Sequence, residues 1–257
     1  MTVSFIGAGN IASHYAKELF AAGCEIDSIL SKRLRSAKSL ASTVNAQATT
    51  SFRKLSRDSN YYILAVPDEM IEELTKALAE HVNPGAVIIH TSGATELKTI
   101  HTHFKHAGFA WPPQSISKEK DIDFNKVPIC IGATDKKTEQ SILQLISLIT
   151  KITYKLNDKQ KLALHLAAVF ANNFSNHMFQ LAYDICKEHK LDFHLLYPIL
   201  LETPNKVIGN IPNDVQTGPA VRQDLATLQK HLHLLKTDSN KKKIYKLLSD
   251  SIKKSNS

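Results

Sequence analysis

The sequence predicts an α/β fold in which a doubly wound, mostly parallel sheet is followed by an all-α C-terminal domain. Two observations support this prediction. Short apolar runs alternate with helical periodicity over residues 1–156, as is typical of a parallel sheet with crossover helices. From residue 157 onward, long helical patterns replace the strands. We therefore predict two domains, residues 1–156 and residues 157–257.

The composition is that of an ordinary globular chain, with 257 residues, 43% hydrophobic and 22% charged. The formal net charge of +8 raises the question of nucleic-acid binding. However, seven lysines lie between Lys236 and Lys254, interleaved with apolar residues as on an amphipathic helix with a solvated basic face. No nucleic-acid recognition motif accompanies the charge, so we expect no nucleic-acid partner.

The three cysteines, Cys24, Cys130 and Cys186, are widely spaced and fit neither a metal site nor a disulfide framework. Reduced thiols are typical of the cytoplasm. The first strand begins directly after Met1, which leaves no room for a signal peptide, and no apolar run approaches the length of a membrane span. We therefore expect a cytoplasmic protein without a metal or a membrane association.

The N-terminal stretch has the pattern of a strand, a glycine turn and a helix. Residues 3–6 form a short, mainly apolar run, and apolar side chains recur at helical spacing over residues 11–20. The two glycines allow a tight turn and close approach of the backbone to a pyrophosphate, which the first helical turn would face. This is the dinucleotide fingerprint of a Rossmann domain, and a glycine turn that binds nothing is the alternative. The predicted cofactor contacts here are Gly7, Gly9, Asn10, Ile11 and Ala12.

The end of the second predicted strand, residues 25–31, distinguishes NAD from NADP. A carboxylate there binds the ribose 2′-hydroxyl of NAD, whereas arginine accommodates the 2′-phosphate of NADP. Asp27 has roughly the right separation from the glycines, but apolar residues follow it, which places it near the start of the strand. Ser31, Lys32 and Arg33 stand at the end and suit a phosphate. We predict NADP (NADPH) as the cofactor; a basic loop in a basic protein is the alternative.

Two further strand ends extend this predicted site. Apolar strands are expected over residues 61–66 and 86–89, and ligands of parallel sheets bind beyond the carboxyl ends of the strands. Turn chemistry alone would also explain the proline and glycine that follow these strands. The predicted cofactor contacts added here are Val66, Pro67, Asp68, Thr91, Ser92 and Gly93.

Beyond these strands, Trp111 lies in an extended segment, where it either walls the pocket or packs in the core. A long, buried helix is predicted over residues 162–186, and it carries many polar residues that need partners. At about 100° per residue, His165, Asn172 and Asn176 share one face, with Asn173 in the adjoining row. Two interpretations remain open. This face lies against the nicotinamide of the cofactor, or its residues have hydrogen-bond partners in the core or at a dimer contact.

A second polar stretch lies near the C-terminus, at residues 216–224. Gly218 and Pro219 predict the start of a helix there. A helix start with Thr217 and Arg222 could hold a carboxylate or a phosphate. A helix cap with a surface ion pair is the alternative.

The order of these motifs resembles a family of bacterial proteins that have an N-terminal NADP-type Rossmann domain and a C-terminal helical domain of unknown function. Its wider superfamily includes pyrroline-5-carboxylate reductases, 6-phosphogluconate and hydroxyisobutyrate dehydrogenases, ketopantoate reductases and deazaflavin-dependent NADP reductases. The resemblance implies hydride transfer and a dimerising, 6-phosphogluconate dehydrogenase-like C-terminal domain. It covers nearly the whole chain and rests on residues 7–12, 65–68, 90–93, 113–115, 165–177 and 216–224.

Two positions depart from the superfamily pattern. Many members have histidine or tyrosine before the proline, where this chain has Trp111. The hydroxyacid dehydrogenases and ketopantoate reductases use a lysine on the long helix as a proton donor, whereas the comparable helix here offers His165. Lys161 is close in sequence, but we expect it outside the buried face. Membership of the superfamily therefore does not establish the same reaction.

The predicted function is an NADP-dependent oxidoreductase that transfers a hydride between NADP(H) and a small C=O or C=N substrate. His165 is the predicted general acid because imidazole titrates near neutral pH. The asparagines would orient the substrate or the cofactor amide, and an anionic substrate group would bind Thr217 and Arg222. The predicted catalytic residues are His165, Asn172, Asn173, Asn176, Thr217 and Arg222.

Other functions fit the same motifs. A non-catalytic NADP-binding regulatory or partner protein would keep the glycine turn without a proton donor, and a dehydrogenase-derived structural subunit is a third possibility. In each case we expect a homodimer through the helical domain, because the long helix is too apolar for solvent.

Overall fold

The chain divides into two compact units, Met1–Ala171 and Asn172–Ser257. The computed structural model describes residues 1–117 and 122–256. The division concerns compactness alone, so the boundary that we predict between the cofactor-binding and helical domains, after residue 156, stays a prediction.

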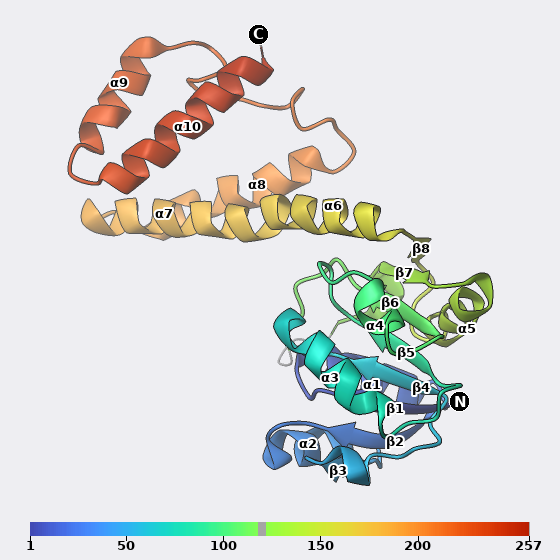
Figure 1. Cartoon of the computed structure of the whole chain (residues 1–257). Coiled ribbons are helices and arrows are strands. Elements are labelled where there is room, and N and C mark those ends of the chain that lie inside the picture. Colours follow the sequence, from blue (N-terminus) through green and yellow to red (C-terminus); the bar gives the residue numbers. More distant parts are fainter. Residues whose placement is uncertain (118–121, 257) are drawn as a thin grey trace. The chain divides into compact units, whose positions relative to one another are not determined.

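The first unit is built on an eight-stranded sheet of order β3-β2-β1-β4-β5-β6-β7-β8 (Figure 1). Neighbouring strands are parallel throughout except for β6 and β7, which are antiparallel. The predicted doubly wound, mostly parallel sheet is therefore confirmed. The strands are β1 (Thr2–Ile6), β2 (Glu25–Leu30), β3 (Gln47–Thr49), β4 (Tyr61–Leu64), β5 (Val87–His90), β6 (Ala107–Trp111), β7 (Ile129–Ala133) and β8 (Thr153–Lys155).

Helices cover both faces of this sheet. The central strand β4 shows why, since all four of its residues are buried: Tyr61 and Ile63 pack in one apolar cluster, and Tyr62 and Leu64 in another. Helices α1, α2 and α5 contribute to the first cluster, and α3 and α4 to the second. The helices of this unit are α1 (Asn10–Ala21), α2 (Leu34–Ala41), α3 (Ile71–Ala79), α4 (Lys98–His101), α5 (Lys136–Ile146) and α6 (Asp158–Ala168).

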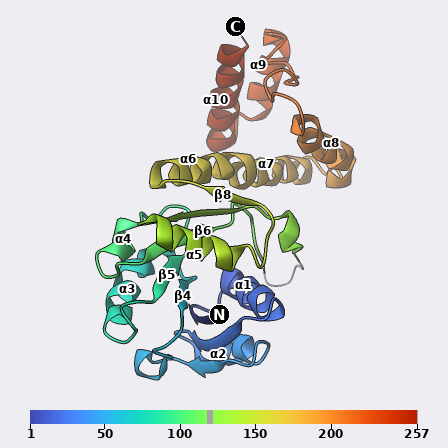
Figure 2. The same cartoon turned by 90° about the vertical axis from the view of Figure 1, so that its right-hand side faces the viewer.

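The second unit is helical. A π-helical segment, Val169–Phe174, follows α6 and contains the boundary between the units. The helices are α7 (Ser175–Glu188), α8 (Tyr197–Val207), α9 (Leu225–Leu234) and α10 (Ser239–Ser255). Helices α9 and α10 lie side by side (Figures 1 and 2), and His231 Nδ1 is 2.8 Å from the Tyr245 hydroxyl between them.

Few side chains of the second unit are buried. Cys186, Ala220, Leu228 and Leu235 are its buried apolar residues within the described part, whereas Ile208 is 75% exposed. The long helix predicted over residues 162–186 exists with a π-helical interruption, but its predicted burial is wrong for the single chain. The sequence pattern reveals an apolar face and does not reveal whether the same chain covers it.

The predicted helix start at Gly218 and Pro219 is also wrong. Residues 219–223 form turns, and α9 begins only at Leu225, where the Asp224 carboxylate accepts a hydrogen bond from the backbone N–H of Thr227 at 3.0 Å. The helix begins after Asp224, and not at Gly218, because aspartate is a better N-cap residue than glycine. Among residues 1–117 and 122–256, none of the helices has the length and apolar character that crossing a membrane would require.

Candidate functional site

The glycine turn after β1 is fixed by its backbone geometry. Gly7 has a φ of +111°, and a Cβ atom at this position would lie 2.2 Å from the Ala65 carbonyl oxygen, so only glycine fits. A Cβ at Gly9 would meet only that same oxygen, at 4.0 Å. Gly9 is also the N-cap of α1, with no side-chain cap and no acidic residue in the first helical turn. The turn therefore leaves an uncovered helix N-terminus facing open space, which suits a diphosphate.

A cavity of about 430 Å³ lies in front of this turn. It is formed at the carboxyl ends of β1, β4, β5 and β6, together with α6. The predicted cofactor residues that line it are Gly9, Asn10, Ile11, Val66, Pro67, Asp68, Thr91, Ser92 and Gly93. The cavity is also lined by Ala65, Gln114 and Ile116, which the sequence did not single out as pocket residues. The structure thus brings three separate predicted stretches together at one cavity.

The remaining predicted cofactor residues lie outside the cavity wall. Gly7 forms the turn behind it, and Ala12 is fully buried in the core, where a small side chain lets α1 approach the sheet. Ser31 follows β2 at the same sheet edge, and its backbone N–H donates to the Thr49 carbonyl at 3.1 Å. Lys32 and Arg33 are exposed beside it, and Arg33 is the N-cap of α2.

Asp27 lies away from the carboxyl end of β2 and is hydrogen-bonded there. It is the third residue of β2, and its carboxylate accepts hydrogen bonds from the hydroxyls of Ser56, at 3.3 Å, and Ser59. This placement agrees with the prediction that Asp27 lies early in the strand.

His165 and Trp111 form the other end of the cavity. Their ring centroids are 5.7 Å apart, with the planes at 64°. A Cβ at Gly93 would lie 2.6 Å from His165 Cδ2 and 2.8 Å from Trp111 Cε2, so the glycine makes room for both rings. Trp111 is 7% exposed, packs in a buried cluster with Phe109 and Cys130, and also lines the cavity, so both of its predicted roles apply.

The prediction that Lys161 lies outside the buried face is wrong, because its side chain is only 1% exposed. Its ammonium donates to the Thr95 carbonyl, lies 3.1 Å from Asp158 Oδ1, and stands 4.2 Å above the Phe109 ring. Burial lowers the pKa of Lys161, and the nearby Asp158 carboxylate opposes this shift. The sequence signals only the Asp158–Lys161 ion pair, through a spacing of three residues on one helix, and not the burial of the lysine.

His90, at the end of β5, is fully buried beside this cluster. Its Nδ1 accepts a hydrogen bond from the Ser92 N–H at 3.2 Å, so the ring proton belongs on Nε2, which has no partner among the described residues. Burial and then the charge of Lys161 lower the pKa of His90 to about 3. The histidine is therefore neutral at physiological pH.

Residues 113–117 run across the start of α1. The Asn10 side-chain amide donates to the Ile116 carbonyl at 2.9 Å, and His14 Nε2 is 2.9 Å from the Ser117 carbonyl oxygen. Asn10, predicted as a cofactor contact, thus uses its side chain to hold this segment and also lines the cavity.

The other predicted catalytic residues belong to the second unit. Asn172 and Asn173 lie in the π-helical segment, Asn176 in α7, Thr217 in an irregular segment and Arg222 in a turn, and all of them are exposed. Regular spacing of about 100° does not hold through a π-helix, so the shared face calculated for His165 and Asn176 is not valid. Their catalytic roles stay predictions.

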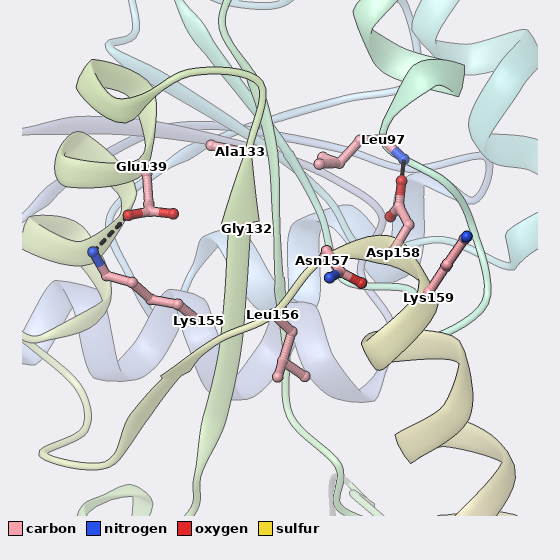
Figure 3. A pocket seen from close by; sticks show the side chains of 9 residues that line it. All are labelled: Leu97, Gly132, Ala133, Glu139, Lys155, Leu156, Asn157, Asp158 and Lys159. Carbon is pink, nitrogen blue, oxygen red and sulfur yellow. Dashed lines mark hydrogen bonds and ion pairs between the residues drawn. The ribbon is translucent and has the colours of Figure 1, made fainter.

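A separate cavity of about 630 Å³ lies where β8 leads into α6 (Figure 3). Lys155 and Glu139 form an ion pair across one side at 2.5 Å. On the other side, Asp158 Oδ2 accepts a hydrogen bond from the Leu97 N–H at 2.9 Å. This second cavity therefore adjoins the loop that follows β5.

Comparison with known proteins agrees with this architecture. Residues 2–93 match the family described as NADP oxidoreductase coenzyme F420-dependent, and residues 127–252 match a domain of unknown function, DUF2520. No curated protein matches the chain.

Solved structures resemble the chain over almost its full length. A candidate NADP oxidoreductase from Bacteroides fragilis is 34% identical, with 98% of each chain covered and a TM-score of 0.90. A Thermotoga maritima protein is 19% identical, with 99% and 98% covered and a TM-score of 0.77. An imine reductase from Myxococcus stipitatus, solved with NADP+, is 12% identical, with 99% and 92% covered and a TM-score of 0.72. The last two likenesses concern the fold alone. From the first relative and the two matched regions, we conclude that the chain belongs to the family of NADP oxidoreductase-like proteins that join an N-terminal Rossmann domain to a C-terminal domain of unknown function.

Proposed function

We propose that this protein transfers a hydride between NADP(H) and a small C=O or C=N substrate. One observation carries the proposal: a single cavity joins the glycine turn to His165 and Trp111. The first feature suits a dinucleotide diphosphate, and the second supports a role for His165 in proton transfer to a substrate bound in that cavity.

The residues around the turn fit NADP(H). Gly9 leaves the N-terminal amides of α1 uncovered for the diphosphate. Ser31, Lys32 and Arg33 would hold the 2′-phosphate, because a hydroxyl and two exposed cations beyond β2 match its charge. The bound nicotinamide would supply the hydride.

In this proposal the chain's own groups orient the substrate and move one proton. During reduction, a protonated imidazole of His165 donates its proton to the substrate oxygen or nitrogen as the adjacent carbon becomes reduced. Trp111 walls that end of the cavity and would exclude water, and Gln114, which also lines the cavity, would orient a polar substrate. Asn172, Asn173, Asn176, Thr217 and Arg222 keep the proposed roles of orienting the nicotinamide amide and holding an anionic substrate group.

We further propose that the chain functions as a homodimer through its helical unit. That unit buries very few apolar side chains and exposes many, which is unusual for a stable monomer. We also propose that the protein works in the reducing cytoplasm, because Cys24, Cys130 and Cys186 are all buried, free thiols.

The direct test is NADPH oxidation with a panel of small aldehydes, ketones and cyclic imines. The His165→Ala variant should reduce kcat by about 100-fold or more, with little change in NADPH affinity. Substitution of the exposed His103 by alanine is the matched control and should leave both quantities unchanged. NADPH binding without turnover of any compound would favour the non-catalytic regulatory or partner protein. Equal turnover by His165→Ala would remove the assignment of the general acid.

A further inference from the structure

A buried charge lies one helical turn before His165. The Lys161 ammonium has three N–H donors, and three acceptors surround it: the Thr95 carbonyl, the Asp158 carboxylate and the face of the Phe109 ring. The side chain is 1% exposed and does not line the NADP(H) cavity. The Lys161 ammonium is therefore held by these groups and lies outside that cavity.

The same cluster joins the loop after β5 to the first turn of α6 at two points. Thr95 is bound through its carbonyl to Lys161, and Leu97 is bound through its N–H to the second oxygen of Asp158, at 2.9 Å (Figure 3). The start of α6 is itself held by a capping box between Asn157 and Gln160. The helix and the loop are thus joined by two hydrogen bonds, and the two side chains that make them, Lys161 and Asp158, form an ion pair with each other on α6.

This junction sets the position of the catalytic end of the cavity. Within the loop, the Ser92 hydroxyl accepts hydrogen bonds from the N–H groups of Ala94, at 3.1 Å, and Thr95, at 2.9 Å, and this turn contains Gly93. One helical turn after Lys161, the His165 ring lies against Gly93 and Trp111. A shift of α6 along the loop would separate these rings.

We propose that Lys161 is a positioning residue: together with Asp158, its ion-pair partner on α6, it clamps the loop of residues 92–97 to α6 through Thr95 and Leu97 and thereby holds His165 against Gly93 and Trp111. This role is distinct from that of a proton donor. It rests on the proposed function only in that His165 is the group positioned; the clamp itself exists without cofactor or substrate.

Trp111 is the only tryptophan of the chain, so its fluorescence reports on this contact directly. In the cofactor-free protein, Lys161→Met should shift the Trp111 emission to longer wavelength, as should His165→Ala. The double variant should show no shift beyond the larger single one, because both changes break the same contact. Lys159→Met, which removes an exposed lysine from the same helical turn, is the control and should leave the emission unchanged.

If Lys161→Met does not fold, Asp158→Asn provides a second variant. It keeps an oxygen acceptor for the Leu97 N–H and removes the ion pair with Lys161. It should shift the Trp111 emission to longer wavelength as well. Wild-type emission in both Lys161→Met and Asp158→Asn, or additive shifts in the double variant, would overturn the proposal. These readouts need no turnover, so they are independent of the proposed reaction.

Where turnover is measured, Lys161→Met should lower kcat about 100-fold through misplacement of His165 and should leave the shape of the pH profile unchanged. Loss of a pH-dependent limb with unchanged Trp111 emission would instead identify Lys161 as a proton donor.

Discussion

His90 illustrates how burial alone can fix the state of a titratable residue. Its ring is enclosed at the end of β5, and its pKa falls from 6.5 to about 3. Between these two values the unfolded chain binds a proton that the folded protein does not. The associated stability is therefore present above pH 6.5 and is lost as the pH falls towards 3.

This linkage gives a measurable acid sensitivity. Lowering the pH from 7 to 5 should reduce the free energy of unfolding by about 2 kcal/mol through His90. His90→Gln should remove that part of the loss, since glutamine stays neutral. Urea unfolding at both pH values provides the measurement, with the exposed His103→Gln as control. An acid loss in His90→Gln as large as that of the wild type would contradict the buried, neutral histidine.

The two glycines of the first turn should separate folding from binding. Gly7→Ala should lower the free energy of unfolding by about 3 kcal/mol, because the new Cβ meets the Ala65 carbonyl oxygen at a strained φ. Gly9→Ala should leave stability nearly unchanged, because its φ of −82° and open surroundings accept a methyl group. It should nevertheless weaken NADPH binding about tenfold, by occupying space next to the diphosphate.

Denaturant unfolding and NADPH titration measure the two quantities. Full NADPH affinity in Gly9→Ala would show that the turn does not hold the cofactor, and equal losses of stability in both variants would contradict the open surroundings of Gly9.

At the scale of elements, the carboxyl end of β2 should decide the choice of cofactor. Arg33→Ser should lower NADPH affinity about tenfold and leave NADH affinity unchanged, because only NADPH carries the 2′-phosphate. Lys38→Ser, on the exposed side of α2, is the matched control. Nicotinamide fluorescence titrations give both affinities, and a parallel loss of NADH affinity would argue against a phosphate contact at Arg33.

Most of the sheet was predictable because its strands are apolar runs bounded by turns, and β1, β2, β4 and β5 lie close to their predicted positions. Strand β3 was missed because three residues carry too little periodicity. The π-helical segment and the late start of α9 depend on local hydrogen bonds that a regular helical pattern does not reveal.

The site was predictable to a similar degree and for a related reason. Strand ends of a parallel sheet meet by topology, so residues such as Ser92 and Pro67 could be assigned to one cavity in advance. The burial of Lys161 could not, because it depends on a loop carbonyl and an aromatic ring far away in sequence. Tertiary partners of a polar side chain leave little trace in the local pattern.

At the scale of the whole molecule, the helical unit should need a second copy of the chain. Leu201 and Ile208 are 69% and 75% exposed. Sedimentation should show a wild-type dimer at micromolar concentration and a monomer for the double variant Leu201→Glu and Ile208→Glu. Thr203→Glu changes an already exposed polar residue of α8 and should remain dimeric. A wild-type monomer at high concentration would exclude the dimer.

Calorimetric titration with NADPH and NADH is the most direct test of cofactor binding at the glycine turn. We predict one NADPH bound per chain, with higher affinity than NADH, at the cavity in front of Gly9. An absence of heat with both coenzymes, or binding of NADH as tight as that of NADPH, would contradict it.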